Sequence, residues 1–276
     1  MDQISTDIVH DTIRVRSNNS YKGTYGKVGL IGGNQNFGGA IIMASAATVH
    51  SGAGLVTTFT DRVNLSSLHN HVPEAMFVDY DDTSSLEKLI PTFNVIVIGP
   101  GLGTDTKSLK ILNKVFSLVQ KNQILVIDGS AITMIAKYKV KLPDAIKIFT
   151  PHQMEWQRLS GIKINNQTEE ENMMKVKQLN STVVLKSHHT EIYDSNNVLK
   201  NPGGTPAQAT GGMGDTLAGM VGGFVAQFHN KYNAILSAVF MHSKIADELA
   251  KTQYVVLPSQ IIKYIPEFMK DYEKKV

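Results

Sequence analysis

The sequence has no cysteine among its 276 residues. This absence excludes disulfide bonds, thiolate zinc sites and cysteine nucleophiles. The chain also has no run of the roughly 20 apolar residues that a membrane-spanning helix needs, and its N-terminus has no apolar signal-peptide core. We therefore expect a cytoplasmic protein with no membrane partner.

The sequence also has little excess of positive over negative charge. Its 27 basic and 24 acidic residues give a formal net charge of +3 and form no long basic run. This distribution gives no support to a nucleic-acid partner. With 42% hydrophobic residues and no composition break that would mark a linker, the chain is predicted to form one domain over residues 1–276.

Short apolar runs recur along the first two thirds of the chain. Such runs, rich in Val and Ile and alternating with helix-length segments, are typical of buried strands in a parallel sheet. The predicted class is therefore a three-layer α/β sandwich, with a mainly parallel central sheet and helices on both faces. The predicted strands begin at Lys27, Gly54, Glu74, Asn94, Gln123, Ala145 and Ser181.

The last third of the chain has a different pattern. Residues 191–200 predict a short hairpin with its turn at Asn196 and Asn197, and three helices are predicted to follow. The predicted helices cover residues 213–228, 231–252 and 258–272. The apolar surface of the middle helix fits core packing, the commoner explanation, or a subunit interface.

The most informative segment is residues 201–219, where a glycine cluster ends in Gly212-Met213-Gly214-Asp215 and leads into an apolar helix. A glycine-rich turn before a helix directs free backbone N–H groups and the positive end of the helix dipole at one point, which suits phosphate. Asp215 would repel phosphate but could take a proton from a hydroxyl that attacks phosphorus. The alternative is an ordinary turn with Asp215 as the N-cap.

Three glycines inside that helix, at positions 219, 222 and 223, weigh against the ordinary turn. Each lowers helix stability by about 1 kcal/mol relative to alanine, so we expect close approach of backbone or ligand to compensate. Most other positions are apolar, which predicts a buried helix with a site at its tip.

Two further glycine-rich loops follow predicted strands, where ligands bind in open parallel sheets. Residues 32–40 match neither the dinucleotide fingerprint nor the nucleoside-triphosphatase loop, so a tight turn and a substrate loop are both possible. The loop Gly-Pro-Gly-Leu-Gly at residues 99–103 would let backbone amides approach a ligand, with Asp105 capping the next helix.

The turn at residues 150–155 carries a possible polar pair. His152 and Glu155 lie three residues apart, so they share a face if the helix has begun, and Glu155 could order water around magnesium. The alternative is a capping arrangement in which Glu155 reaches back to the helix start. Lys186 ends a strand and could meet phosphate or solvent. The adjacent His188 and His189 should point oppositely on an extended chain, which favours a surface loop over a metal site.

In order along the chain, these motifs resemble the ribokinase-like superfamily and, within it, the ADP/ATP-dependent NAD(P)H-hydrate dehydratases. The most specific parts are the loop at residues 99–103, Thr-Pro-His-x-x-Glu at residues 150–155, Leu185-Lys186 and the segment 209–219. Kinases of the superfamily usually have asparagine where His152 stands, which favours the dehydratase branch.

The resemblance implies repair of hydrated NADH or NADPH with ADP or ATP as co-substrate and Mg²⁺ as cofactor. Asp215 would deprotonate the ring hydroxyl, and Gly212, Met213 and Gly214 would form the anion hole. The residues expected to contact the hydrated cofactor are Ala40, Gly103, His152 and Asp215. Those expected to bind the nucleotide are Lys186, Ser187, His188, His189, Thr190 and Gly214. Glu155 is the expected indirect partner of the metal, and the resemblance implies a homo-oligomer, namely a tetramer.

The sequence departs from the family pattern at several points. Gly129 and Ser130 stand where the family usually continues Asp-Ala-Asp, Ser187 replaces a glycine, and Met213 replaces a serine. Residues 203–205 replace a usual Thr-Gly-Asn. These departures leave the proposed base in place. Two other functions stay open: a small-molecule kinase of the same fold, acting on a vitamin precursor, and a nucleotide-binding regulator without catalysis.

Overall fold

The computed structural model describes residues 2–274, so the two ends of the predicted domain, residues 1 and 275–276, lie outside the described part. Within that part, ten strands form one sheet in the order β1-β10-β9-β8-β7-β6-β5-β2-β3-β4. The strands are β1 (Asp2–Gln3), β2 (Lys27–Ile31), β3 (Leu55–Thr60), β4 (Met76–Asp79), β5 (Val95–Ile98), β6 (Ile124–Ile127), β7 (Ile146–Phe149), β8 (Ser181–Leu185), β9 (Glu191–Tyr193) and β10 (Val198–Lys200).

The seven predicted strands are confirmed as β2 to β8, and neighbours among them pair in parallel. The predicted hairpin is confirmed as the antiparallel pair β9 and β10. Its turn is fixed by Asp194, whose carboxylate accepts the backbone N–H groups of Asn196 and Asn197. The edge strand β1, which the sequence analysis did not predict, pairs with β10.

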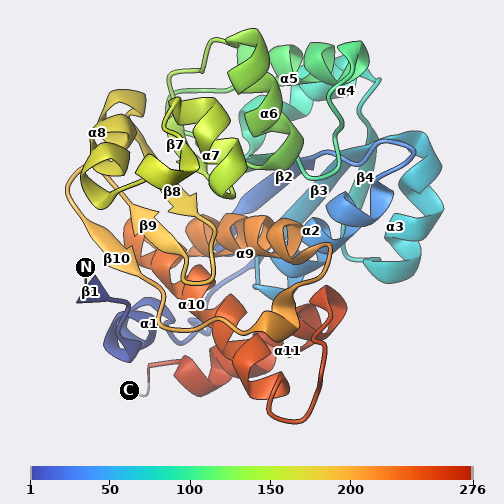
Figure 1. The fold of residues 1–276 in the computed structure, drawn as a ribbon. Helices are drawn as coiled ribbons and strands as arrows, with labels where there is room; N and C mark the ends of the chain where they lie inside the picture. The colour runs from blue at the N-terminus through green and yellow to red at the C-terminus, as the bar shows by residue number, and fades with distance from the viewer. Residues whose placement is uncertain (1, 275–276) are drawn as a thin grey trace.

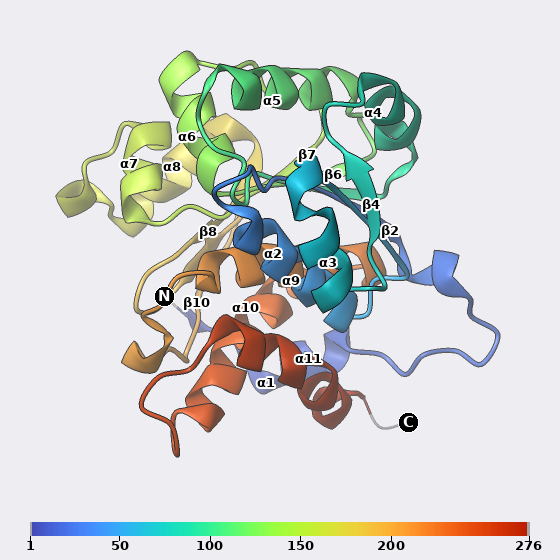
Figure 2. The same cartoon turned by 90° about the vertical axis from the view of Figure 1, so that its right-hand side faces the viewer.

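Helices cover both faces of the sheet, which confirms the predicted three-layer class (Figure 1). One face carries α4 (Thr83–Leu89), α5 (Thr106–Leu118), α6 (Gly129–Tyr138), α7 (Gln153–Ser160) and α8 (Glu169–Leu179). The other carries α1 (Thr6–Thr12), α2 (Gly38–His50), α3 (Leu65–His71), α9 (Met213–Gln227), α10 (Lys231–Leu249) and α11 (Pro258–Tyr272). On this second face, α10 and α11 lie beyond α2 and α9 as seen from the sheet (Figures 1 and 2).

Alternate side chains along each central strand point to opposite faces of the sheet, so two hydrophobic cores form. Val95 and Val97 of β5 face the core on the α9 side, whereas Ile96 and Ile98 face the core on the α5 side. This is the period-2 pattern of a strand buried on both faces. Within residues 2–274, no helix has both the length and the apolar character needed to cross a membrane.

The predicted close packing of α9 is confirmed, and its partner is the backbone of α2. A Cβ atom added at Gly219 would lie 2.1 Å from the carbonyl oxygen of Ala44, and one at Gly223 would lie 2.7 Å from the Cβ of Ser51. The Thr48 hydroxyl also donates to the Gly219 carbonyl, at 2.9 Å. The glycines therefore let the middle of α9 approach α2 to backbone contact.

Candidate active site

The loops that follow β2 and β5 are joined at the carboxyl edge of the sheet. The Gly33 N–H donates to the Pro100 carbonyl and the Asn34 N–H to the Gly101 carbonyl, both at 2.8 Å. A Cβ atom added at Gly101 would lie 2.9 Å from that of Ala40. Ala40, a predicted substrate contact, therefore lies against the loop that carries Gly103.

Gly103 itself is fixed by Ser130, one of the departures from the family pattern. The Gly103 N–H donates to the Ser130 hydroxyl oxygen at 3.1 Å, and Gly103 has a φ of +87° in the left-handed region. Ser130 lies in the first turn of α6, directly after β6. Ser130 thus links the loop at residues 99–103 to the start of α6. The serine that departs from the family pattern therefore has a structural role.

His152 and Glu155 form the predicted capping arrangement at the start of α7. The His152 Nδ1 accepts the N–H groups of Met154 and Glu155, and the Glu155 carboxylate accepts the N–H of His152 at 2.9 Å. Because Nδ1 accepts, the neutral ring carries its hydrogen on Nε2. The His152 side chain is 53% exposed and that of Glu155 only 8%. The His152 Nε2 lies 3.7 Å from the Glu155 carboxylate oxygen, which is too long for a hydrogen bond, so its hydrogen can still be donated to a ligand.

Asp128 is the residue that the sequence analysis missed as a member of the site. Its carboxylate is buried at the end of β6 and accepts from the Lys186 ammonium at 2.8 Å and from the Thr150 hydroxyl at 2.7 Å. The ion pair spans the end of β7, which lies between β6 and β8. The position of Asp128 directly after a predicted strand was the signal available in the sequence.

Lys186 faces the start of α9. A Cβ atom added at Gly214 would lie 3.1 Å from the Lys186 Nζ. Burial acts to lower the pKa of Lys186, but the negative charges of Asp128, Glu155 and Asp215 outweigh it and raise the pKa. Lys186 is therefore a charged ammonium group beside the predicted anion hole.

The residues of the predicted anion hole lie at the first turn of α9. Gly212 precedes it with a φ of +94°, and the Thr216 N–H is the first in the helix to bond back, to the Gly212 carbonyl at 2.9 Å. The N–H groups of residues 213–215 lie in the unpaired first turn of a helix. The Met213 side chain packs against the hydrophobic core. Met213 therefore contributes only its backbone to the turn, which accounts for the tolerance of methionine there.

Asp215 lies in this first turn and is partly buried. Burial raises the pKa of its carboxyl group to about 6, the charge of Asp128 adds to the effect, and the charge of Lys186 opposes it. A carboxylate whose pKa lies near neutrality can accept a proton and still be largely ionised at pH 7. The site therefore places a carboxylate with a raised pKa beside a cation and a helix N-terminus.

The prediction that His188 and His189 point in opposite directions is wrong. Their ring centroids lie 4.2 Å apart, because the chain turns at residues 187–189 instead of staying extended. This turn packs on the glycines that replace the usual Thr-Gly-Asn: a Cβ atom at Gly204 would lie 2.4 Å from the His188 carbonyl oxygen. Gly204 thus makes room for the turn, whereas a Cβ atom at Gly203 would instead lie 2.6 Å from the Asp247 carboxylate.

A cavity of about 160 Å³ lies between this turn and α9. It brings together five of the six predicted nucleotide-binding residues, namely Lys186, Ser187, His188, Thr190 and Gly214. His189 is outside its lining. The cavity is also lined by Met213 of the predicted anion hole and by residues that were not predicted as site residues, namely Gly204, Gln208, Leu217, Val239, His242 and Ser243.

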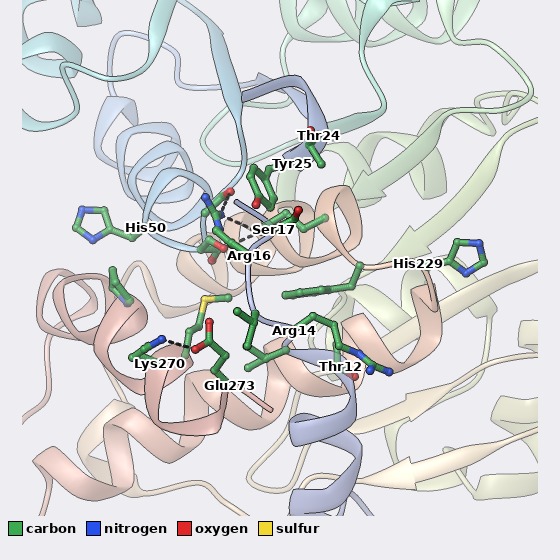
Figure 3. A pocket seen from close by; sticks show the side chains of 18 of the residues that line it. Thr12, Arg14, Arg16, Ser17, Thr24, Tyr25, His50, His229, Lys270 and Glu273 are labelled. Carbon is green, nitrogen blue, oxygen red and sulfur yellow. Dashed lines mark hydrogen bonds and ion pairs between the residues drawn. The ribbon is translucent and has the colours of Figure 1, made fainter. Parts of the chain in front are cut away.

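A larger cavity, of about 1130 Å³, opens elsewhere, among the end of α2, the end of α9, α11 and the segment after α1 (Figure 3). Its polar side chains are largely used by the fold: Arg16 donates to Gln227 and lies over the ring of Tyr25, and Lys270 pairs with Glu273. Helix ends, not the carboxyl ends of the strands, form its floor. We therefore place the candidate active site at the smaller cavity and the adjoining loops.

Known proteins resemble this chain over nearly its whole length. The family model described as NAD(P)H-hydrate dehydratase matches residues 28–267. An ADP-dependent (S)-NAD(P)H-hydrate dehydratase of Lactiplantibacillus plantarum is 55% identical over 274 residues, which cover 99% of each chain. The crystal structure of a ribokinase-like superfamily protein from Enterococcus faecalis has a TM-score of 0.98 at 47% identity and covers 100% of this chain and 97% of that one.

A more distant relative has a structure that was obtained with a nucleotide. The ADP/ATP-dependent NAD(P)H-hydrate dehydratase of Bacillus subtilis, co-crystallised with ATP and Mg²⁺, has a TM-score of 0.86 at 27% identity, with 99% of each chain covered. The fold of the present chain is therefore ribokinase-like, as the sequence analysis predicted.

Proposed function

This chain belongs to the NAD(P)H-hydrate dehydratase family, and from that premise we propose that it restores NADH and NADPH from their hydrated forms at the expense of ADP. The choice of ADP and of the (S) form of the hydrate is supported by the name of the relative that is 55% identical over nearly the whole chain. The observation that carries the proposal is the first turn of α9, where the Asp215 carboxylate, free N–H groups and the Lys186 ammonium converge.

The reaction needs a hydroxyl group to become a good leaving group. The ring hydroxyl oxygen attacks the terminal phosphorus of the nucleotide, the bond from that phosphorus to the bridging oxygen breaks, and Asp215 accepts the hydroxyl proton. The ring C–O bond then breaks with both electrons leaving on phosphate, pushed by the ring nitrogen. Loss of a neighbouring C–H proton restores the ring double bond. With ADP, the products are the repaired cofactor, AMP and phosphate.

The side chains of the site divide these tasks. The N–H groups at residues 212–214 and the Lys186 ammonium would hold the transferring phosphoryl group, where charge builds up. Ala40, Gly103 and His152 would position the hydrated ring, with the Nε2–H of His152 donating to it. Ser187, His188, His189 and Thr190 would hold the rest of the nucleotide.

The residues present are compatible with Mg²⁺ that arrives with the nucleotide. Among residues 2–274, no group of three or more His, Asp or Glu side chains is arranged to bind a metal directly. Magnesium commonly keeps several waters and uses one or two carboxylates together with substrate phosphates. When bound, it would neutralise phosphate charge, with Glu155 as the proposed indirect partner. One domain, a homo-oligomeric state and a cytoplasmic location also stay predictions.

A direct assay tests the proposed function. The purified protein with Mg²⁺ and ADP should regenerate the near-ultraviolet absorbance of reduced nicotinamide from hydrated NADH, and ATP should be tried in parallel. Release of AMP and phosphate in equal amounts with the repaired cofactor would separate this reaction from that of a small-molecule kinase. No recovery with either nucleotide would rule out the dehydratase function.

The rate should also depend on pH through Asp215. Because burial raises the pKa of this carboxyl group to about 6, its basic form predominates at pH 7 and is lost as the pH falls. We expect kcat/KM to fall about tenfold per pH unit on the acid side of that value. Steady-state rates between pH 5 and 8 at saturating ADP measure this limb, and a flat profile would contradict the assignment of Asp215 as the base.

A further inference from the structure

A third cavity, of about 770 Å³, lies at the opposite edge of the sheet from the candidate active site. It opens between the last turns of α5 and α8 and the segment that leads into β7, which places it at the amino ends of the parallel strands. Its volume lies within the roughly 300–1,000 Å³ typical of small-molecule sites. The reaction proposed above uses none of the residues that line it.

Lys147 is the buried cation of this cavity. It is the second residue of β7, and only 7% of it is exposed. Within residues 2–274 its ammonium group makes one hydrogen bond, to the Ala145 carbonyl oxygen at 2.9 Å. An ammonium group has three hydrogens to donate, and a buried charge normally has a partner of opposite charge. Lys147 therefore has unused donors that suit an anionic ligand.

The acidic residue in the cavity wall does not neutralise Lys147. Asp144 pairs with Lys121 at 3.4 Å instead, and the two side chains are 81% and 85% exposed. Lys141 is a second lysine in the lining. Because the wall holds two lysines and one aspartate, it has a surplus of one positive charge. A ligand with a single negative charge would balance that surplus.

The strand beside β7 carries a second polar group without a partner. The register of β7 and β8 places Ser181 opposite Lys147, so both side chains are on the same face of the sheet. The Ser181 Oγ is buried and has no hydrogen-bond partner within the described residues. Buried polar groups nearly always have partners. Two adjacent positions of the sheet therefore have unused hydrogen-bonding capacity at this edge.

The helix ends decide which anion the cavity suits. α5 and α8 end beside it, at Leu118 and Leu179, and the C-terminal end of a helix carries partial negative charge. Each end lowers the affinity for a single negative charge by about two- to fivefold, whereas a hydrogen bond from an ammonium group raises it by about 10- to 100-fold. The ammonium therefore outweighs the helix ends for a carboxylate. A phosphate dianion would be opposed more strongly and would meet only one buried cation.

The apolar part of the wall indicates what the carboxylate is attached to. Phe116, Val119 and Leu142 line the same cavity as Lys147. Covering these side chains with a hydrocarbon group removes apolar surface from water, which favours binding. The cavity thus combines one buried cation with an apolar wall.

We propose that this cavity binds an apolar monocarboxylate of the size of a medium-chain fatty acid. The carboxylate accepts hydrogen bonds from the Lys147 ammonium, and the hydrocarbon part lies against Phe116, Val119 and Leu142. This inference does not depend on the proposed function, because the candidate active site lies at the carboxyl ends of the strands.

Calorimetric titration of the whole protein with octanoate tests this inference, with 1-octanol as an uncharged probe of similar length. Lys147→Met keeps a long side chain but removes the ammonium, and it should lower octanoate affinity by about 10- to 100-fold. The affinity for 1-octanol should not change. The matched control is Lys110→Met, at an exposed position of α5, which should leave both affinities as they are in the native protein.

A second variant keeps the test decisive if Lys147→Met does not fold. Ser117 is exposed and lines the cavity, so Ser117→Trp should block octanoate binding while leaving the ammonium in place. Saturating ADP should not displace octanoate, since the two sites lie at opposite edges of the sheet.

Several results would overturn the inference. These are a native protein that does not bind octanoate, one that binds 1-octanol as tightly as octanoate, and unchanged octanoate affinity in Lys147→Met or Ser117→Trp. Displacement of octanoate by inorganic phosphate would assign the cavity to a phosphate instead. Displacement by ADP would place octanoate in the candidate active site.

Discussion

Replacing Asp215 by asparagine should lower kcat for the repair of hydrated NADH by about 10²- to 10⁴-fold, the usual contribution of a positioned general base. Asparagine has nearly the same shape but cannot take the hydroxyl proton. ADP should bind the variant as tightly as the native protein or more tightly, because the negative charge beside the phosphate site is removed. Steady-state kinetics and calorimetric ADP titration measure the two effects.

The same variant separates an enzyme from a nucleotide-binding regulator. A regulator would show no turnover in the native protein and equal ADP affinity in both forms. Asp271→Asn, on the exposed side of α11, is the matched control and should change neither quantity. If Asp215→Asn keeps most of its turnover, proton transfer to Asp215 is not part of the reaction.

Local sequence signals predicted most of the fold because they act within a few residues of each other. The apolar runs gave all of β2 to β8, since a strand buried on both faces needs a continuous run of apolar residues. The cap at Asp105 and the hairpin turn at Asn196 and Asn197 follow from backbone hydrogen bonds between neighbouring residues. Strand β1 has two residues and depends on its pairing with distant β10, so no local signal marks it.

The parts of the site that were missed depend on contacts between distant segments. Asp128 and Lys186 are 58 residues apart and meet only because β6 and β8 flank β7. His242 lies in the middle of a predicted apolar helix, where a single histidine has no distinguishing pattern. The error at His188 and His189 came from assuming an extended chain where it turns. Such features can be recognised only from the three-dimensional arrangement, whereas the glycine-rich turns can be recognised from the sequence itself.

The second large effect is expected at the buried ion pair. Lys186→Met should lower the free energy of unfolding by about 3–5 kcal/mol, because it leaves a buried carboxylate without its cation. Asp128 would keep the Thr150 hydroxyl, at 2.7 Å, as a side-chain donor. The Lys186 pKa is raised, so its contribution is fully present at pH 7 and is lost only as the pH rises through that raised value. Urea unfolding at pH 7 measures the loss.

A double-mutant cycle with Asp128→Asn separates loss of the pair from other effects of the substitutions. The asparagine side chain carries no charge, so Lys186→Met combined with Asp128→Asn should lose less stability than the sum of the two single variants. The affinity for ADP should depend on Lys186 alone and not on the pair. It should weaken wherever Lys186 is absent, since the phosphate loses its cation, and persist in Asp128→Asn, where the ammonium is still present. Additive stability losses would show that the pair, although 2.8 Å apart, does not couple energetically. Equal ADP affinity in all four proteins would place the phosphate away from Lys186 and therefore away from the start of α9.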